Sequence, residues 1–97
     1  MSPVRVQLSR RAGWRLPPNT RSVAYPSKFA NPHRPTSRSP EANAAAVERY
    51  RAHLRAHPEL VAAIRDELAG VNVACWCPLT LPCHGDDVLA VAAGEDP

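Results

Sequence analysis

The densest group of chemically reactive side chains lies in the last quarter of the 97-residue chain. All three cysteines fall within nine residues, and a histidine follows the last of them directly. Thiolate sulfur and imidazole nitrogen are the usual ligands of tetrahedral structural zinc. One hypothesis is therefore a zinc site formed by Cys75, Cys77, Cys83 and His84. The spacing departs from common zinc sites, because a single residue separates the first two cysteines and the last two ligands are adjacent.

The same residues are also typical of thiol chemistry without a metal. Cys83 lies just before a predicted helix, and a helix N-terminus favours the nucleophilic thiolate form. His84 would serve as a base or proton donor, and Asp86 is a further candidate reactive group. A third interpretation is that the cysteines are buried core residues, since free cysteine is among the most buried residue types. The sequence leaves these three interpretations open.

Charge is distributed very unevenly along the chain. Residues 1–40 contain eight basic residues and no Asp or Glu, whereas residues 41–97 contain four arginines and nine acids, so the net charges are +8 and −5. Such asymmetry predicts a positive surface that meets an anion such as a phosphate, a nucleotide or a nucleic acid. The alternative is that the basic half pairs with the acids of the other half.

The loop Pro26–Pro32 combines side chains that suit an anion site. Lys28 would neutralise a phosphate, Ser27 would donate a hydrogen bond to it, and Phe29 would stack on a base. Asn31 precedes a proline and is therefore restricted to an extended conformation, which would orient its side chain. The alternative is an exposed turn in which the aromatic ring covers the core.

A second basic and aromatic group precedes this loop. Arg10, Arg11 and Arg15 surround Trp14 in the sequence. Arginine beside an aromatic ring is compatible with contacts to phosphates and bases. The alternative is that the tryptophan belongs to the core and the arginines are solvated.

These residues need a scaffold, and the hydrophobic pattern predicts one α/β domain over residues 1–97. Strands are predicted at residues 4–8, 22–25 and 71–75. Helices are predicted from Pro40, with Ser39 as the N-cap, again from Pro58, and from Gly85 to Ala93. We therefore expect a short mixed sheet of about three strands packed by about three helices, with a basic, loop-rich half at 1–40 and a helical half at 41–97. The composition favours partial disorder between residues 31 and 39.

The composition also restricts the location of the protein. No run of eighteen apolar residues is present, and the N-terminus has no apolar signal region. An odd number of cysteines argues against a disulfide framework. We therefore expect a cytoplasmic protein that does not bind a membrane.

The chain resembles the prokaryotic and phage family catalogued as domain of unknown function 4326. The resemblance rests on VQLSRRAGWRLP (6–17), YPSKFANP (25–32), ELAG (67–70), and ACWCP (74–78) running to CHGD (83–86). The family commonly has Trp-Gly-Asn-Pro where this chain has Phe29-Ala30-Asn31-Pro32, so an aromatic and a small residue are retained. The resemblance implies a self-contained intracellular domain and favours a functional role for the Pro26–Pro32 loop, but it implies no activity.

Our leading hypothesis is a domain that binds a nucleotide or nucleic acid. If it is an enzyme, we expect it to process nucleotides or nucleic acids with its Cys/His loop. The alternative is a non-enzymatic module, stabilised by zinc, that binds nucleic acid or a partner protein. A protein that binds a host protein is a third hypothesis.

Overall fold

The computed structural model describes residues 2–37 and 39–97. Three short strands form one sheet: β1 (Arg5–Gln7), β2 (Thr20–Ser22) and β3 (Asn72–Cys75). Their order is β1-β3-β2, and both pairings are parallel. Strand β3, the last of the three in the sequence, therefore lies at the centre of the sheet and is paired on both edges.

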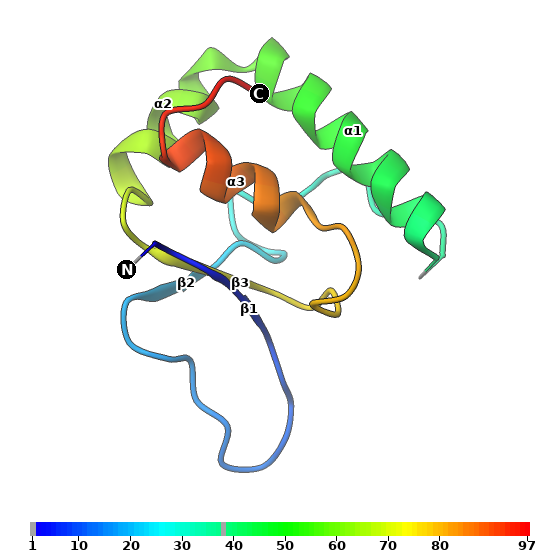
Figure 1. Ribbon diagram of the computed structural model, residues 1–97, viewed down its shortest axis with the longest axis vertical. Coiled ribbons are helices and arrows are strands. Elements are labelled where there is room, and N and C mark those ends of the chain that lie inside the picture. The colour runs from blue at the N-terminus through cyan, green and yellow to red at the C-terminus, as the bar shows by residue number, and fades with distance from the viewer. Residues whose placement is uncertain (1, 38) are drawn as a thin grey trace.

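The α/β class with three strands and three helices is confirmed, but the sheet is purely parallel rather than mixed in strand direction. A loop of residues 8–19 separates β1 from β2, which is long enough for the chain to pass to the far side of β3. Strands that run in the same direction need a long connection, whereas a tight turn would give an antiparallel hairpin. In Figure 1 this loop extends away from the helices, on the opposite side of the strands.

Strand β2 begins earlier than the prediction of 22–25. The prediction followed the apolar residues Val23 and Ala24, whereas the regular pairing is made by the polar segment before them. Val23 still donates a backbone hydrogen bond to Ala74 at 2.8 Å, and the chain then turns through a bond from Ser27 N to Ala24 O. The apolar pair is thus buried beyond the end of the strand rather than within it.

The helices agree closely with their sequence signals. Helix α1 spans Pro40–Ala56, α2 spans Pro58–Glu67 and α3 spans His84–Ala92. Ser39 caps α1, with its hydroxyl accepting a hydrogen bond from Ala42 N at 3.1 Å. No helix within residues 2–37 and 39–97 is long and apolar enough to cross a membrane.

The core lies between the strands and the three helices, which share one side of the sheet (Figure 1). Helix α3 lies against β1 and β3 and also contacts α1 and α2. Tyr50 of α1 is fully buried and donates its hydroxyl to Phe29 O at 2.9 Å. This bond ties the loop after β2 to α1. The largest buried side chains are Tyr50, Phe29, Leu54, Ile64, Leu68, Val23, Val73, Val88 and Val91.

Candidate functional site

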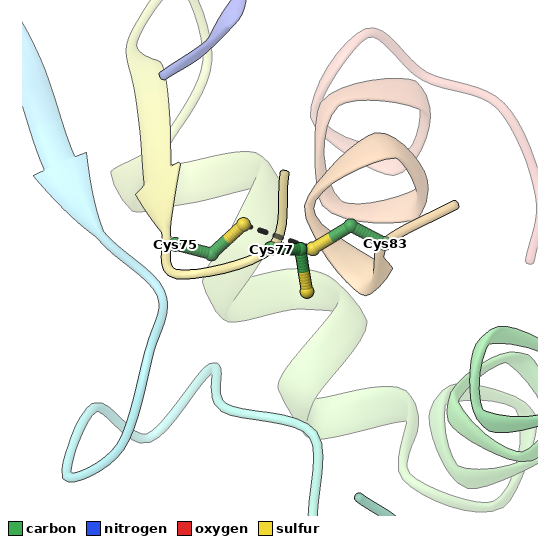
Figure 2. A group of neighbouring side chains, drawn as sticks. All are labelled: Cys75, Cys77 and Cys83. Carbon is green, nitrogen blue, oxygen red and sulfur yellow. Dashed lines mark hydrogen bonds between the residues drawn. The ribbon is translucent and has the colours of Figure 1, made fainter. Parts of the chain in front are cut away.

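The three cysteines converge from the end of β3 and the start of α3. Cys75 is the last residue of the central strand, Cys77 follows in the turn, and Cys83 is the N-cap of α3. Their sulfur atoms all lie within 4.8 Å of one another, and Cys75 Sγ is 2.9 Å from Cys83 Sγ. Figure 2 shows this close pair joined by the dashed line, with Cys77 beside it. The cluster is a product of local folding, because only seven residues separate its outer members.

His84 is buried beside the cluster and has a defined orientation. Its Nε2 lies 2.9 Å from Val23 O, and because a carbonyl oxygen only accepts, this nitrogen carries the proton. In the neutral ring Nδ1 is then an acceptor, and it lies 3.7 Å from Cys83 Sγ. The ring also meets Tyr50 edge to face, with 5.0 Å between centroids. The imidazole is thus positioned to accept a proton from the Cys83 thiol.

The surroundings favour a negative charge on one particular sulfur. Hydrogen bonds from Cys75 and Cys77, together with His84, lower the pKa of Cys83, while burial opposes this shift. Hydrogen bonding to the other two sulfurs and burial raise the pKa of Cys75. Gly85 N also lies 3.4 Å from Cys83 Sγ at the start of α3. A thiolate in this cluster therefore belongs on Cys83.

Arg5 organises the chain segment between the cysteines. Its side chain is 8% exposed, and Nη2 donates to Leu79 O at 3.0 Å and Leu81 O at 2.8 Å. Nε lies 3.4 Å from Asp86 Oδ1, whereas Nη1 is buried without a hydrogen-bond partner among the described residues. Burial disfavours the guanidinium charge, but interaction with Cys83 and Asp86 raises the pKa of Arg5 above its ordinary value. A buried cation is therefore held against the thiols.

A cavity of about 590 Å³ opens over this cluster. The three cysteines and His84 line it together with residues from the loop after β2 and from α1. The other polar and aromatic residues that line it are Arg10, Tyr25, Asn31, Arg34, Ser37, Asn43 and Trp76. The cysteine cluster and the Pro26–Pro32 loop, about fifty residues apart in the sequence, thus share one cavity.

Two pairs of arginine and aromatic side chains belong to this cavity. Arg10 lies over the Trp76 ring at 4.9 Å from its centroid, and Arg34 lies over Tyr25 at 5.4 Å. The rings remain accessible, with Trp76 44% and Tyr25 76% exposed. No Asp or Glu of the described residues lines the cavity. Its charge is therefore positive.

Two asparagines contribute differently to the cavity wall. Asn31 Nδ2 donates to Ala46 O at 2.9 Å, and its Oδ1 accepts from His33 N, so both ends of this amide are occupied. Asn43 Nδ2 donates to Pro82 O at 2.9 Å, but its Oδ1 is buried with no partner in the described chain. Asn31 holds the loop in place, whereas Asn43 has a buried acceptor without a partner among the described residues.

The structure divides the site residues predicted from sequence into two groups. Those that line the cavity are Arg10, Asn31, Cys75, Cys77, Cys83 and His84. Those that do not line it are Arg11, Trp14, Arg15, Ser27, Lys28, Phe29 and Asp86. The loop after β2 therefore contributes through its ends rather than through its central Ser27-Lys28-Phe29 segment.

The residues outside the cavity have other neighbours. Phe29 is completely buried in the core, as the alternative interpretation of its loop had it. Lys28 forms an ion pair with Glu67 of α2, and Asp86 is held by Arg5. Trp14 is half-buried in the loop between β1 and β2 and is not part of the core.

Ion pairs neutralise only part of the basic half. Arg5 pairs with Asp86, and Glu67 receives both Arg21 and Lys28. The basic residues of this half that form no ion pair within the described chain are Arg10, Arg11, Arg15 and Arg34. Arg38, which also contributed to the charge argument, lies outside the described residues. Arginine side chains without an ion-pair partner among the described residues thus remain beside the cavity and in the loop after β1.

Several site residues were not singled out from the sequence. Arg5, Tyr25, Arg34, Asn43 and Trp76 come from segments whose proximity depends on the order of the strands. One local signal was present: Trp76 lies between Cys75 and Cys77 in the sequence, and it lines the cavity together with them.

Comparison with known proteins adds a family but no activity. The chain matches no curated protein and no solved structure. The profile of the family described as "Domain of unknown function (DUF4326)" matches residues 6–94, nearly the whole chain. These residues include every element of the sheet, apart from the first residue of β1, and all of the cavity. The protein therefore belongs to the DUF4326 family.

Proposed function

We propose that this domain binds a phosphate-bearing ligand, in the first place a nucleotide, in the cavity over the cysteine cluster. The observation that carries the proposal is the presence, in one cavity of about 590 Å³, of two arginines that lie over exposed aromatic rings and have no ion-pair partner among the described residues. This volume lies within the range of small-molecule sites in proteins, roughly 300–1,000 Å³.

The charges favour an anion. Arg10 and Arg34 have no carboxylate partner among the described residues, and no acid shares the cavity with them. When the flat face of a guanidinium lies on an aromatic ring, the N–H groups at the edge of the guanidinium remain free. These N–H groups match the spacing of two phosphate oxygens. We therefore assign phosphate recognition to these two arginines.

The uncharged part of the cavity suits a nucleobase. The exposed rings of Trp76 and Tyr25 offer stacking surfaces, and stacking on an aromatic side chain stabilises a bound base by about 1–3 kcal/mol. The unpartnered Oδ1 of Asn43 would accept a hydrogen bond from an amino group or a hydroxyl. A simple inorganic anion would use neither feature.

The cysteines and His84 form part of the same wall, so the bound ligand would lie next to thiol sulfur. Both chemical roles considered from the sequence, a reactive Cys83 and a metal centre, would then act on the occupant of the cavity. Free thiols of this kind persist in a reducing compartment, so we propose that the protein works in the cytoplasm.

Isothermal titration with AMP, ADP and inorganic phosphate tests the proposal. The double variant Arg10→Gln/Arg34→Gln should bind the nucleotides at least tenfold more weakly. The matched control Arg11→Gln/Arg15→Gln removes the same charge outside the cavity and should stay within about twofold of the original affinity. Equal losses in both variants, or no nucleotide binding by the unaltered protein, would contradict a nucleotide site in the cavity.

A single-stranded nucleic acid is the second candidate, because Arg11 and Arg15 are also unpaired and lie in the exposed loop that carries Arg10. A short oligonucleotide would then bind more tightly than AMP and would lose affinity in both double variants, with a steep dependence on salt. Fluorescence anisotropy at two salt concentrations distinguishes this result from mononucleotide binding.

A further inference from the structure

We propose that Cys75, Cys77 and Cys83 bind a thiophilic divalent ion of the zinc class whose fourth coordination position is open to the cavity. The inference goes beyond ligand binding by the arginines and does not depend on it. Its basis is the convergence of three sulfurs within 4.8 Å, with every one of them lining the cavity.

The three ligands are held on a rigid frame. Cys75 ends a strand that is paired on both edges, and its carbonyl accepts a hydrogen bond from Leu8 N at 2.8 Å. Cys83 caps α3, and Arg5 secures the intervening turn through its carbonyl oxygens. A divalent ion with sulfur ligands at about 2.3 Å keeps them roughly 3.8 Å apart, so the Cys75 and Cys83 sulfurs would separate by small side-chain rotations.

The charge of the cluster also suits a bound ion. Three thiolates and a divalent cation carry one net negative charge. The buried guanidinium of Arg5 faces these sulfurs, and its Nη1 has no partner in the described structure. A metal-bound thiolate would accept a hydrogen bond from this N–H group, and the guanidinium would balance the negative charge of the site. Groups around metal ligands commonly have this role. A neutral trio of thiols would leave this buried donor without a comparable acceptor.

The fourth position remains available because His84 does not converge with all three sulfurs. Its Nδ1 lies 3.7 Å from Cys83 Sγ, but it is not among the atoms that all lie within 4.8 Å of one another. Structural zinc sites are closed by four protein ligands, whereas sites with three protein ligands retain a position for water or substrate. A water molecule or a donor atom of the cavity's occupant would complete the coordination.

Cobalt binding to the reduced protein tests this inference without a known ligand. Titration with Co²⁺ should give one strong thiolate-to-metal charge-transfer band that saturates at one equivalent and is abolished by Zn²⁺. Replacing Cys75, Cys77 or Cys83 by serine should weaken Co²⁺ binding at least tenfold in each case. Adding imidazole should shift the visible cobalt bands, because an outside donor enters the open position.

A pair of histidine variants tests the vacancy of the fourth position. His84→Gln and the control His53→Gln, which lies on α1 outside the cavity, should both retain Co²⁺ affinity within about threefold. Selective loss of affinity in His84→Gln, with no response to imidazole in the unaltered protein, would show a closed site and overturn the open position.

A second measurement covers the case in which a serine variant fails to fold. Unaltered protein purified without chelator should contain about one zinc per chain, and alkylation of its thiols should release that zinc. A protein that contains no zinc and shows no charge-transfer band with Co²⁺ would overturn the metal site. The arginine variants above leave these ligands in place, so the metal site and the nucleotide site fail separately.

Discussion

At the scale of single residues, Arg5 supports the turn between the cysteines although no local sequence pattern identifies it. In the sequence it is only one of eight basic residues of the first half. In the structure it lies opposite Val73 in the sheet, and its guanidinium donates a hydrogen bond to Leu81 O in the turn between the cysteines. The cysteines could be predicted because they are close in sequence. Arg5 could not, because its position beside them depends on a strand pairing across about seventy residues.

Replacing Arg5 by glutamine should destabilise the protein by about 2–3 kcal/mol. The change removes charge-assisted hydrogen bonds to Leu79 O and Leu81 O and leaves these carbonyls without that donor. Urea denaturation measures the free energy of unfolding. Arg21→Gln is the control, because that side chain is half exposed and its ion pair with Glu67 is screened by water. An equal loss in the two variants would contradict the role assigned to Arg5.

At the scale of secondary structure, the helices were predictable and the strands only in part. Ser39, Pro40 and Pro58 mark helix starts through hydrogen bonding and backbone restriction within one turn, and the structure confirms them. The start of β2 was displaced because its pairing residues are polar and its apolar neighbours lie just beyond it. The parallel order has no local signature, since alternation along a strand says nothing about its partner.

The end of α1 carries a pH-sensitive group, His53, so stability should fall in mild acid. Burial, followed by the neighbouring His57 and His33, lowers the pKa of His53 below its ordinary value of 6.5, with Glu59 acting in the opposite direction. The unfolded chain therefore binds more protons than the folded chain below about pH 6.5. The stability that the neutral His53 ring contributes to the folded chain is therefore complete above about pH 6.5. It is lost as the pH falls from this value towards the lower pKa of His53 in the folded chain.

Thermal unfolding followed by circular dichroism at pH 5 and pH 7.5 measures the effect. The unaltered protein should lose more stability between these values than His53→Gln, which has no ring to protonate. His84→Gln serves as a second comparison, since it leaves the histidine cluster on α1 unchanged. Identical pH dependence in His53→Gln and the unaltered protein would refute the assignment.

At the scale of the whole molecule, the candidate site is a consequence of topology. Arg10, Arg34, Asn43 and the cysteines come from separate stretches of the chain, and they meet because β3 enters between β1 and β2 and directs its carboxyl end towards the cavity. Binding sites of α/β sheets commonly lie beyond the carboxyl ends of their strands. The basic loops and the thiols could each be recognised in the sequence. That they line one cavity could not be predicted without knowing the order of the strands.

The same topology makes folding depend on the last third of the chain. Strands β1 and β2 do not pair with each other, and each is bonded only to β3, while α3 joins the sheet to both other helices. A chain that ends after Gly70 lacks β3 and α3 and should therefore show no cooperative unfolding transition. A control that ends after Gly94 keeps every strand and helix and loses only contacts of the last three residues, chiefly those of Arg55 with Pro97 O and of Arg65 with Glu95 O and Asp96, so it should unfold cooperatively. Urea titrations followed by circular dichroism compare the two, and a cooperative transition in the shorter chain would show that the first seventy residues fold without the central strand.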